Sequence, residues 1–555
     1  MRKFSGPALY LLVCMLWLSA CQSLQHATIS GIQKKSTTSD KQVQLRNTIQ
    51  PDALILEINS GFIRGELTQH AGNIRVFRGL PYADAPIKDK RWKAPLAPIN
   101  WNGVRDATEF GAACPQTDTW KSLKKVSEDC LFLNVWAADK ESSPRPVMVW
   151  IHGGSLTNGS SDMSHYDGSS FAERGVVLVS INYRLGPLGF LAHPDLSAEN
   201  LDNVSGNYGF LDQIAALEWI QNNISAFGGD PDNVTIFGES AGGSSVAVLR
   251  ASPLANGLFH KAILQSPWFF GFKNQIAGPV FAPMDSSQSK ELNGHAEGTA
   301  WVESLDLKMN NNSIAALRNS KWQDLILDRP LYKARPLIDG RLLPNKPMQV
   351  YSKRLGNDTP MLIGTNKHEG TFFSQWFSKL TKEDFEKQLS QQFGEASKTI
   401  LSLYTNDDGS LDLDGITEFV TDAWFVYPVI DMLDNATSHT DKLFHYQFSR
   451  PFQTRPELGS PHAMEIRYVF NTLDTNYGDN IDRLLAAEMQ MYWVEFAKTG
   501  DPNKAGLLQW PIYTNEKKSF LEFDEALKID VNLKQPVIDI LRLAGHLDKP
   551  QLSSR

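Results

Sequence analysis

The stretch from Phe227 to Gly243, FGGDPDNVTIFGESAGG, places the tightest constraint on how this chain can fold. Val234–Phe237 are β-branched or aromatic and predict a buried strand, and the residues from Gly243 onward can open a helix. Ser240 lies at the corner between them. A strand that turns directly into a helix strains the corner residue, and glycines two residues to either side leave out side chains that would collide there. The pattern predicts an exposed nucleophilic Ser240 at the C-terminal edge of a sheet; a structural serine in a tight turn is the alternative.

Apolar runs of strand length predict a large sheet around this corner. Runs without polar alternation are typical of central strands that are covered on both faces. A helix predicted over Phe210–Phe227 precedes the Ser240 strand, and strand, helix, strand in that order predicts parallel pairing. A hairpin (Leu54–Glu57 with Gly61–Glu66) and a helix (Glu488–Lys498) are expected outside this unit. The expected main strands are Ile74–Tyr82, Leu131–Trp136, Val147–Ile151, Val176–Asn182, Met361–Gly364 and Leu443–Phe448.

The fold class predicted from these runs is α/β, with a mixed, mostly parallel central sheet and helices on both faces. The segments Trp301–Tyr332 and Lys382–Thr405 read as helical insertions that form a cap. The chain of 555 residues shows no internal repeat, so we expect one catalytic domain over 51–545, followed by a tail over 546–555.

The N-terminal segment predicts export. Arg2 and Lys3 precede an apolar run that is too short to span a bilayer, and small residues follow it. Residues 1–20 therefore read as a signal peptide, and the sequence Leu-Ser-Ala-Cys resembles a bacterial lipobox with Cys21 as the lipid-bearing residue. Residues 21–50 are polar and predict a flexible tether. We expect an exported cell-envelope lipoprotein, anchored to the outer membrane of a Gram-negative cell.

The net charge and the cysteine content argue against nucleic acid, a metal ion and a cofactor as partners. Loss of residues 1–20 removes two positive charges and no acid, so the net charge moves from −8 to −10, which argues against a nucleic-acid partner. In an oxidising compartment Cys114 and Cys130 are expected to be bridged. They have no histidine neighbours at ligand spacing, so neither a metal site nor a cofactor is expected.

A glycine-rich loop offers the anion-binding groups that an ester-cleaving serine needs. His152, Gly153, Gly154 and Ser155 follow the predicted strand Val147–Ile151 directly. Enzymes with a strand–Ser–helix corner place such a loop so that its backbone N–H groups bind the oxyanion, together with the N–H after the nucleophile. An ordinary loop after a strand is the alternative.

These motifs belong to a longer pattern that resembles the type B carboxylesterases, the α/β-hydrolase family that includes acetylcholinesterase and the non-catalytic neuroligins. The similarity extends from about residue 54 to 525, in the family's order. The matching segments are FRGLPYADAP with RWKAP, SEDCLFLNVW, WIHGGS, NYRLGPLGFL, GNYGFLDQIAALEWIQNNISAFGGDPDNVTIFGESAGG, SPLANGLFHKAILQSP, LIGTNKHEG and FAKTGDPN.

The resemblance implies roles for particular residues. Ser240 would be the nucleophile, Glu369 of KHEG the acid and His462 of SPHAMEI the base, in the chain order that an α/β-hydrolase requires. Glu369 follows a predicted strand after a short turn, and His462 lies in a loop of Gly, Ser and Pro, so both can reach the sheet edge. The implied oxyanion donors are the backbone N–H groups of Gly154, Ser155 and Ala241. Supporting roles fall to Gly153 and Glu239, and Cys114 and Cys130 match the family's bridged loop.

The chain departs from the family pattern at three positions. Ser155 stands where Gly or Ala is common, and a Cβ there restricts the backbone if the loop needs positive φ. Ala463 replaces a usual Gly after the base, and His368 replaces a usual Asp before the acid and is a rival base. None of these changes removes a reacting group.

Together these features predict a serine esterase that acts through an acyl-enzyme. Trp268 and Phe269 are candidates for an aromatic substrate pocket, and core packing is the alternative. Trp120 lies in the cysteine loop, where cholinesterases place a cation-binding Trp, but lysines surround it here. Neutral or acidic esters of small to medium size, including aromatic ones, are therefore expected. A silent binding or adhesion module and a serine amidase or peptidase are the alternatives.

Overall fold

The computed structural model of the protein describes residues 54–547 with short gaps. The chain divides at Pro51, and everything described here belongs to the second unit, Asp52–Arg555. The predicted signal peptide, the tether, Cys21 and Trp120 lie outside the described residues. None of the described helices combines the length and apolar character needed to cross a membrane. The gaps are 69–73, 118–122, 140–142, 273–274, 280–281, 286–292, 306–312, 328, 330, 354, 439, 441 and 475–476.

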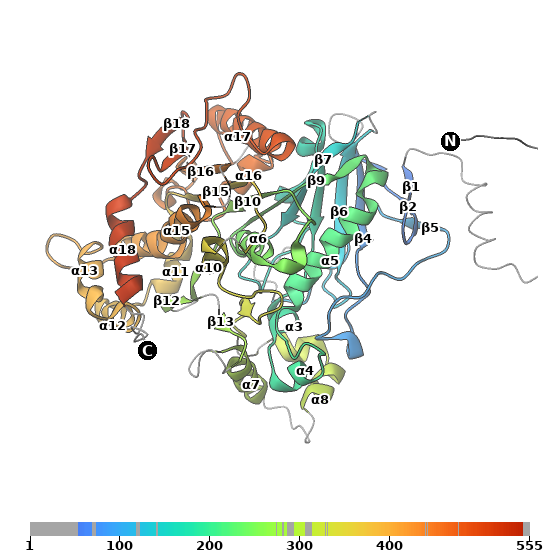
Figure 1. The fold of residues 1–555 in the computed structure, drawn as a ribbon, viewed down its shortest axis with the longest axis horizontal. Coiled ribbons are helices and arrows are strands. Elements are labelled where there is room, and N and C mark those ends of the chain that lie inside the picture. Colours follow the sequence, from blue (N-terminus) through green and yellow to red (C-terminus); the bar gives the residue numbers. More distant parts are fainter. Residues whose placement is uncertain are drawn as a thin grey trace, which may run out of the picture. The chain divides into compact units, whose positions relative to one another are not determined.

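The described chain is built on an 11-stranded sheet (Figure 1). The strands from β17 to β8 run parallel, and β18, β6, β4 and β3 join antiparallel. The prediction of a mixed, mostly parallel sheet is confirmed. In spatial order the strands are β18 (Lys528–Val531), β17 (Ser519–Phe523), β16 (Leu443–Phe448), β15 (Met361–Asn366), β10 (Lys261–Gln265), β9 (Gly229–Glu239), β7 (Arg145–Ile151), β8 (Val177–Ile181), β6 (Phe132–Ala138), β4 (Ile74–Pro81) and β3 (Glu66–Leu67).

Both faces of the sheet are buried, as the apolar runs predict. In β7, Val149 and Ile151 pack into one hydrophobic core, whereas Met148 and Trp150 pack into a second core on the opposite face, because successive strand side chains alternate. The first core also receives α5 (Tyr208–Asn223), α6 (Ala241–Ala251) and α15 (Tyr427–Ala436), and the second receives α2 (Ser169–Glu173) and α17 (Asn480–Thr499).

The boundaries of several elements differ from those expected. Helix α17 begins eight residues before the expected Glu488, because Asp479 and Asp482 form a capping box at its N-terminus. Helix α5 ends at Asn223, and a 3-10 turn over Ile224–Phe227 leads to Gly228 in the left-handed conformation. The predicted hairpin forms as β1 (Ile55–Ile58) and β2 (Gly61–Arg64), which make a separate three-stranded sheet with β5 (Val104–Asp106).

The helical insertions also form. The first is α7 (Gly294–Ser304), α8 (Ser313–Asn319) and α9 (Trp322–Ile326). The second lies between β15 and β16 and is longer than expected. It contains η5 (Glu369–Phe373), α11 (Ser374–Phe377), α12 (Lys382–Phe393), α13 (Ser397–Ser402), α14 (Leu413–Val420), a π-helix η7 (Thr421–Val426) and α15. Other described helices are α3 (Gly186–Phe190), α4 (Pro194–Ala198), α10 (Pro347–Ser352), α16 (Ile466–Val469) and α18 (Gln535–Leu547).

Candidate active site

The corner between β9 and α6 has the strained geometry that the sequence predicts. Ser240 adopts φ 57° and ψ −121°, a conformation that side chains rarely adopt. A Cβ on Gly242 would lie 2.0 Å from the Ile151 carbonyl oxygen, and one on Gly238 would lie 2.6 Å from the same oxygen. Only glycine fits at these two positions, because the end of β7 passes directly against the corner.

The loop after β7 lies beside Ser240. A Cβ on Gly153 would lie 3.1 Å from the Cβ of Ser240, so the two backbones are in contact. Gly154 has φ 103° and Ser155 has φ 56°, so this loop does require positive φ where the chain carries serine. Among the described residues, none accepts a hydrogen bond from the backbone N–H of Gly154, Ser155 or Ala241. These N–H groups are therefore available to a bound anion.

The candidate acid and base are in direct contact. His462 Nδ1 lies 2.5 Å from Glu369 Oε2, and the backbone N–H of Asn366 donates to Glu369 Oε1 at 2.7 Å. Glu369 is fully buried. A buried carboxylate on Nδ1 fixes the orientation of the imidazole and leaves Nε2 to face the reacting groups.

The Nε2 atom of His462 faces the carboxylate of Glu239, with Nε2 and Glu239 Oε1 3.1 Å apart. No described residue forms a hydrogen bond with Ser240 Oγ. Glu239 precedes Ser240 in the chain, so the imidazole already lies at the corner. Hydrogen bonds between a catalytic serine and its base are often long without substrate.

Three buried carboxyl groups surround the imidazole. Burial alone lowers the pKa of His462, but Glu239, Glu369 and Glu465 outweigh it and raise that pKa to about 9. Burial raises the pKa of Glu239 well above its usual range, although the charge of His462 acts in the opposite direction. The charge of Glu239 therefore stabilises the protonated form of His462 across 3.1 Å, although Nε2 and Oε1 form no hydrogen bond in this arrangement.

Sequence reasoning missed Glu465, which lies one helical turn after the base. Its carboxylate accepts from Gln265 Nε2 at 3.0 Å and from Asn366 Nδ2 at 2.7 Å, and the same Asn366 amide donates to the Pro461 carbonyl. Glu465 thus ties the loop that carries His462 (residues 449–465, the base loop) to the ends of β10 and β15. Glu465 is the N-cap residue of α16, but its side chain accepts hydrogen bonds from other segments and not from the helix, so its role is invisible without the fold.

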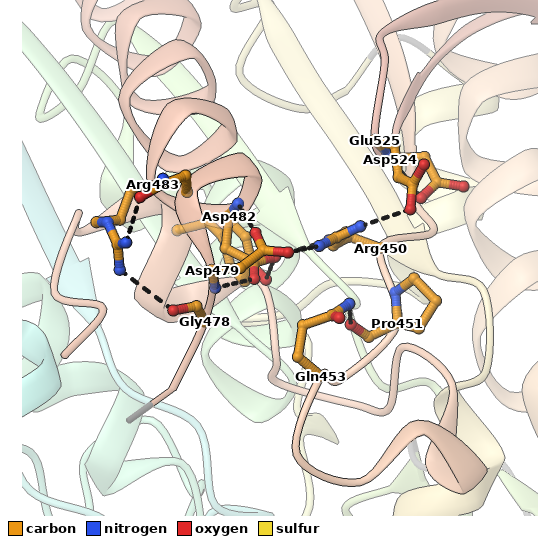
Figure 2. A network of polar contacts seen from close by, with 11 residues as sticks. Arg450, Pro451, Gln453, Gly478, Asp479, Asp482, Arg483, Asp524 and Glu525 are labelled. Atoms are coloured by element: carbon orange, nitrogen blue, oxygen red, sulfur yellow. Dashed lines mark hydrogen bonds and ion pairs between the residues drawn. The ribbon is translucent and has the colours of Figure 1, made fainter. Parts of the chain in front are cut away.

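Both ends of the base loop are attached to the carboxylate of Asp482, and Figure 2 shows the end at Arg450. Arg450 follows β16 and donates from Nε to Asp482 Oδ1 at 2.7 Å; Tyr468, in α16, donates its hydroxyl to the same oxygen at 2.8 Å. Arg450 also bonds Asp479 and Glu525, each at 3.0 Å. The capping box of α17 therefore fixes the stems of the loop that carries His462.

The other departures from the family pattern have clear structural places. Ala463 adopts φ 68°, a conformation that favours glycine. The Nδ1 atom of His368 accepts a hydrogen bond from the backbone N–H of Ser460 at 3.1 Å, and the His368 N–H donates to the Ser460 carbonyl. Burial lowers the pKa of His368. This histidine holds the base loop against the turn that carries Glu369 (residues 367–370, the acid loop). It does not occupy the position of the reacting base.

Aromatic rings enclose the base. Phe372, Phe373 and Phe425 lie with ring centroids 5.7, 5.2 and 4.8 Å from the His462 ring. Phe372 is half exposed, whereas the other two are buried. Phe425 lies in the π-helix η7, and Thr421 of the same helix accepts from the Gly370 N–H at 2.9 Å. The π-helix thus contacts both the acid loop and the base.

Trp268 and Phe269 are buried, with 6% and 1% of their surfaces exposed. Trp268 donates its backbone N–H to the Ser240 carbonyl at 3.4 Å, so it lies next to the corner; a role in the substrate pocket stays a prediction.

Cys114 and Cys130 form the expected disulfide. Across the described residues, no group of three or more His, Cys, Asp or Glu side chains could hold a metal ion.

Comparison with known proteins identifies the family. Residues 52–541 match the carboxylesterase family. The para-nitrobenzyl esterase of Bacillus subtilis (strain 168) is 36% identical over 477 residues, which cover 82% of this chain and 92% of that protein. The fumonisin B1 esterase of Sphingopyxis macrogoltabida is 34% identical over 477 residues, covering 82% and 84%. A solved structure of a PNB esterase is similar with a TM-score of 0.75 at 33% identity, covering 88% of this chain and 100% of that chain. The chain belongs to the carboxylesterase family.

Proposed function

We propose that this carboxylesterase cleaves esters through an acyl-enzyme on Ser240, with His462 as the base and Glu369 as the acid. The observation that carries the proposal is the strained Ser240 corner, at which the hydrogen-bonded Glu369–His462 pair and the Gly154 loop meet. Strain of this kind persists only where the surrounding structure enforces it.

The reaction takes place in two steps. His462 Nε2 removes the Ser240 proton as Oγ attacks the ester carbonyl, and the N–H groups of Gly154, Ser155 and Ala241 bind the oxyanion. The protonated His462 then gives its proton to the leaving alcohol. Water releases the acid in the second step, with His462 again as base. Glu369 stabilises the imidazolium in both steps.

We propose neutral or acidic esters of small to medium size, including aromatic ones, as substrates. The half-exposed ring of Phe372 beside His462 supports an aromatic or apolar alcohol group, because it offers an apolar surface next to the leaving-group proton donor. The name of the para-nitrobenzyl esterase, a relative at 36% identity, supports the same class.

The test is a hydrolysis panel of p-nitrophenyl esters of increasing acyl length beside matched p-nitroanilides. Cleavage of the esters that far exceeds cleavage of the anilides is expected; equal or faster anilide cleavage would assign an amidase. Ser240→Ala should abolish turnover and covalent labelling by an organophosphate, with Ser225→Ala, at an exposed position, as the control. A Ser240→Ala variant that keeps more than a trace of activity would overturn the assignment, and failure of the native protein to react would favour a silent binding module.

We also propose that the protein is exported and anchored through a lipid on Cys21. The disulfide between Cys114 and Cys130 supports an oxidising compartment. Metabolic labelling with a fatty acid, followed by membrane fractionation, tests the anchor. Cys21→Ala should lose the label and leave the membrane fraction; unchanged fractionation would contradict the proposal.

A further inference from the structure

The carboxamide of Gln116 joins two loops: the loop closed by the Cys114–Cys130 disulfide and the loop that follows β7. Its Nε2 donates to the Gly159 carbonyl at 2.7 Å, and its Oε1 accepts from the Gly159 N–H at 2.8 Å. The second Nε2 proton goes to the Cys114 carbonyl at 3.1 Å. Both N–H groups of this buried carboxamide donate hydrogen bonds. The orientation of the carboxamide is fixed, because its N–H faces the Gly159 carbonyl and its oxygen faces the Gly159 N–H.

Gly159 lies against the loop of Gly153, Gly154 and Ser155, which carries two of the proposed oxyanion donors. It adopts φ 113°, and a Cβ there would lie 2.3 Å from His152 Nδ1 and 2.7 Å from the Gly153 carbonyl oxygen. The backbone of Gly159 therefore lies against both the His152 ring and the Gly153 carbonyl oxygen, and this oxygen lies 2.8 Å from His152 Nδ1. The loop is closed between these points by hydrogen bonds from the Thr157 and Asn158 N–H groups to the Gly154 carbonyl, at 3.0 and 2.9 Å.

The Gly153 carbonyl and the Gly154 N–H belong to one peptide group. A peptide group is planar and trans, so its C=O and N–H point in opposite directions. Whatever fixes the Gly153 oxygen on the Gly159 side also fixes the Gly154 N–H on the opposite side. A displacement of about 1 Å in such a donor can cost about 100-fold in rate.

The other end of Gln116 is covalently restrained. Cys114 lies two residues before it and is bridged to Cys130, and the Ala113 N–H donates to the Lys125 carbonyl at 2.9 Å. The Gln116 side chain therefore extends from a loop that a disulfide closes. It forms two hydrogen bonds with the backbone of Gly159, as a neighbouring β-strand would.

We propose that Gln116 is a positioning residue for the oxyanion site: it holds the Gly153–Gly154 peptide so that the Gly154 N–H is directed at the transition state. This inference rests on the proposed function, because it takes Gly154 as an oxyanion donor. Gln116 itself does not contact the reacting atoms. Its removal should lower kcat while substrate binding is retained.

The experiment compares Gln116→Met with Gln221→Met. Methionine has a similar shape and removes the hydrogen bonds at either site. Gln221 lies in α5, and its carboxamide donates to the Pro231 and Leu258 carbonyls at 2.9 and 3.1 Å, so its loss costs comparable contacts away from the loop. For each variant kcat, KM, the urea midpoint and the Ki of a trifluoromethyl ketone are measured. Such a ketone adds to the nucleophile and leaves a tetrahedral oxyanion, so its affinity reports the oxyanion site.

Gln116→Met should lower kcat about 10- to 100-fold and weaken the ketone by a similar factor, with KM within about threefold. Gln221→Met should shift the urea midpoint comparably and leave kcat unchanged. Gln116→Glu gives a second readout: a protonated carboxyl can donate to Gly159 as the amide does, so its kcat relative to the native enzyme should rise as pH falls.

Three results would overturn the proposal: an unchanged kcat in Gln116→Met, a loss confined to KM, or ketone affinity that does not follow kcat. Failure of the proposed function gives a different pattern, in which Ser240→Ala keeps its activity whatever Gln116 does. If Gln116→Met does not fold, Gln116→Glu carries the test alone, and a kcat ratio to the native enzyme that is flat with pH then overturns the proposal.

Discussion

Glu239 should set the pH range in which the enzyme works. The Glu239→Gln substitution keeps the shape of the side chain and removes the charge that lies 3.1 Å from His462 Nε2. His462 must be neutral to accept the Ser240 proton, so activity is lost as pH falls through its pKa. An ordinary imidazole would place this limb between about pH 6 and 8. The three carboxyl groups around His462 shift the expected limb upward, toward its pKa of about 9.

The size of the effect follows from the geometry. Unit charges 3.1 Å apart attract by about 5 kcal/mol at an effective dielectric constant of 20. Burial offsets much of this attraction, and the net rise from 6.5 to about 9 is worth about 3.4 kcal/mol. The charge of Glu239 is the largest single favourable contribution, ahead of the charge of Glu369, the hydrogen bond from Glu369 and the charge of Glu465, so we assign it at least a quarter, or about 0.9 kcal/mol. Glu239→Gln should therefore lower the midpoint of the acidic limb by at least about 0.6 pH unit.

The assay is kcat/KM for one p-nitrophenyl ester between pH 5 and 10. Glu457→Gln is the matched control, because it removes the same charge from an exposed position in the base loop. It should leave the midpoint unchanged. The reasoning is refuted if Glu239→Gln leaves the midpoint unchanged, as the control Glu457→Gln should, or if Glu239→Gln moves the acidic limb to higher pH.

Three further outcomes are expected. Burial lowers the pKa of His445 to about 3. Below about pH 6.5 this histidine is therefore protonated in the unfolded chain but neutral in the folded chain. The free energy of unfolding consequently decreases as the pH is lowered through that range. His445→Phe should reduce the loss of unfolding free energy between pH 8 and pH 5, measured with urea, by about 2 kcal/mol; an unchanged loss contradicts this. Replacing Cys114 and Cys130 together by Ser should lower the unfolding free energy by about 3 kcal/mol, and a difference below about 1 kcal/mol would argue against the loop-closure reasoning. Ser155→Gly should keep kcat within about threefold, since the donor is a backbone group; a loss of tenfold or more would assign a role to the hydroxyl.

The sequence predicts those parts of the fold that depend on local pattern. Apolar runs place β4, β6, β7, β8, β15 and β16 to within two residues, but they do not predict β10 or β17. The spacing of Gly238 and Gly242 around Ser240 predicts the strained corner before any contact is known. Glu369 and His462 depend on the family resemblance, because 93 positions separate them and the chain has 12 histidines.

The rest depends on contacts that only the folded chain creates. Gln116 and Glu465 are ordinary polar residues in the sequence, yet each is buried and bonds a segment far away in the chain; Gln265 and Glu465 lie 200 positions apart. The residue types of Ser155 and Ala463 do not predict their positive φ; only the glycines that are common at these positions in the family indicate it. Residue type alone does not reveal which buried polar group serves the site.

The π-helix at Thr421–Val426 gives this segment a place where a change in length can be absorbed. A π-turn holds one residue more than an α-turn, and removing that residue would restore a continuous α-helix without turning the helices on either side. A one-residue deletion in α14 has no such extra residue to lose, so everything after it would rotate by about 100° around the helix axis. Thr421 would then leave Gly370, and Phe425 would leave the His462 ring. Engineers who shorten this insertion should therefore cut at the π-helix and leave α14 intact.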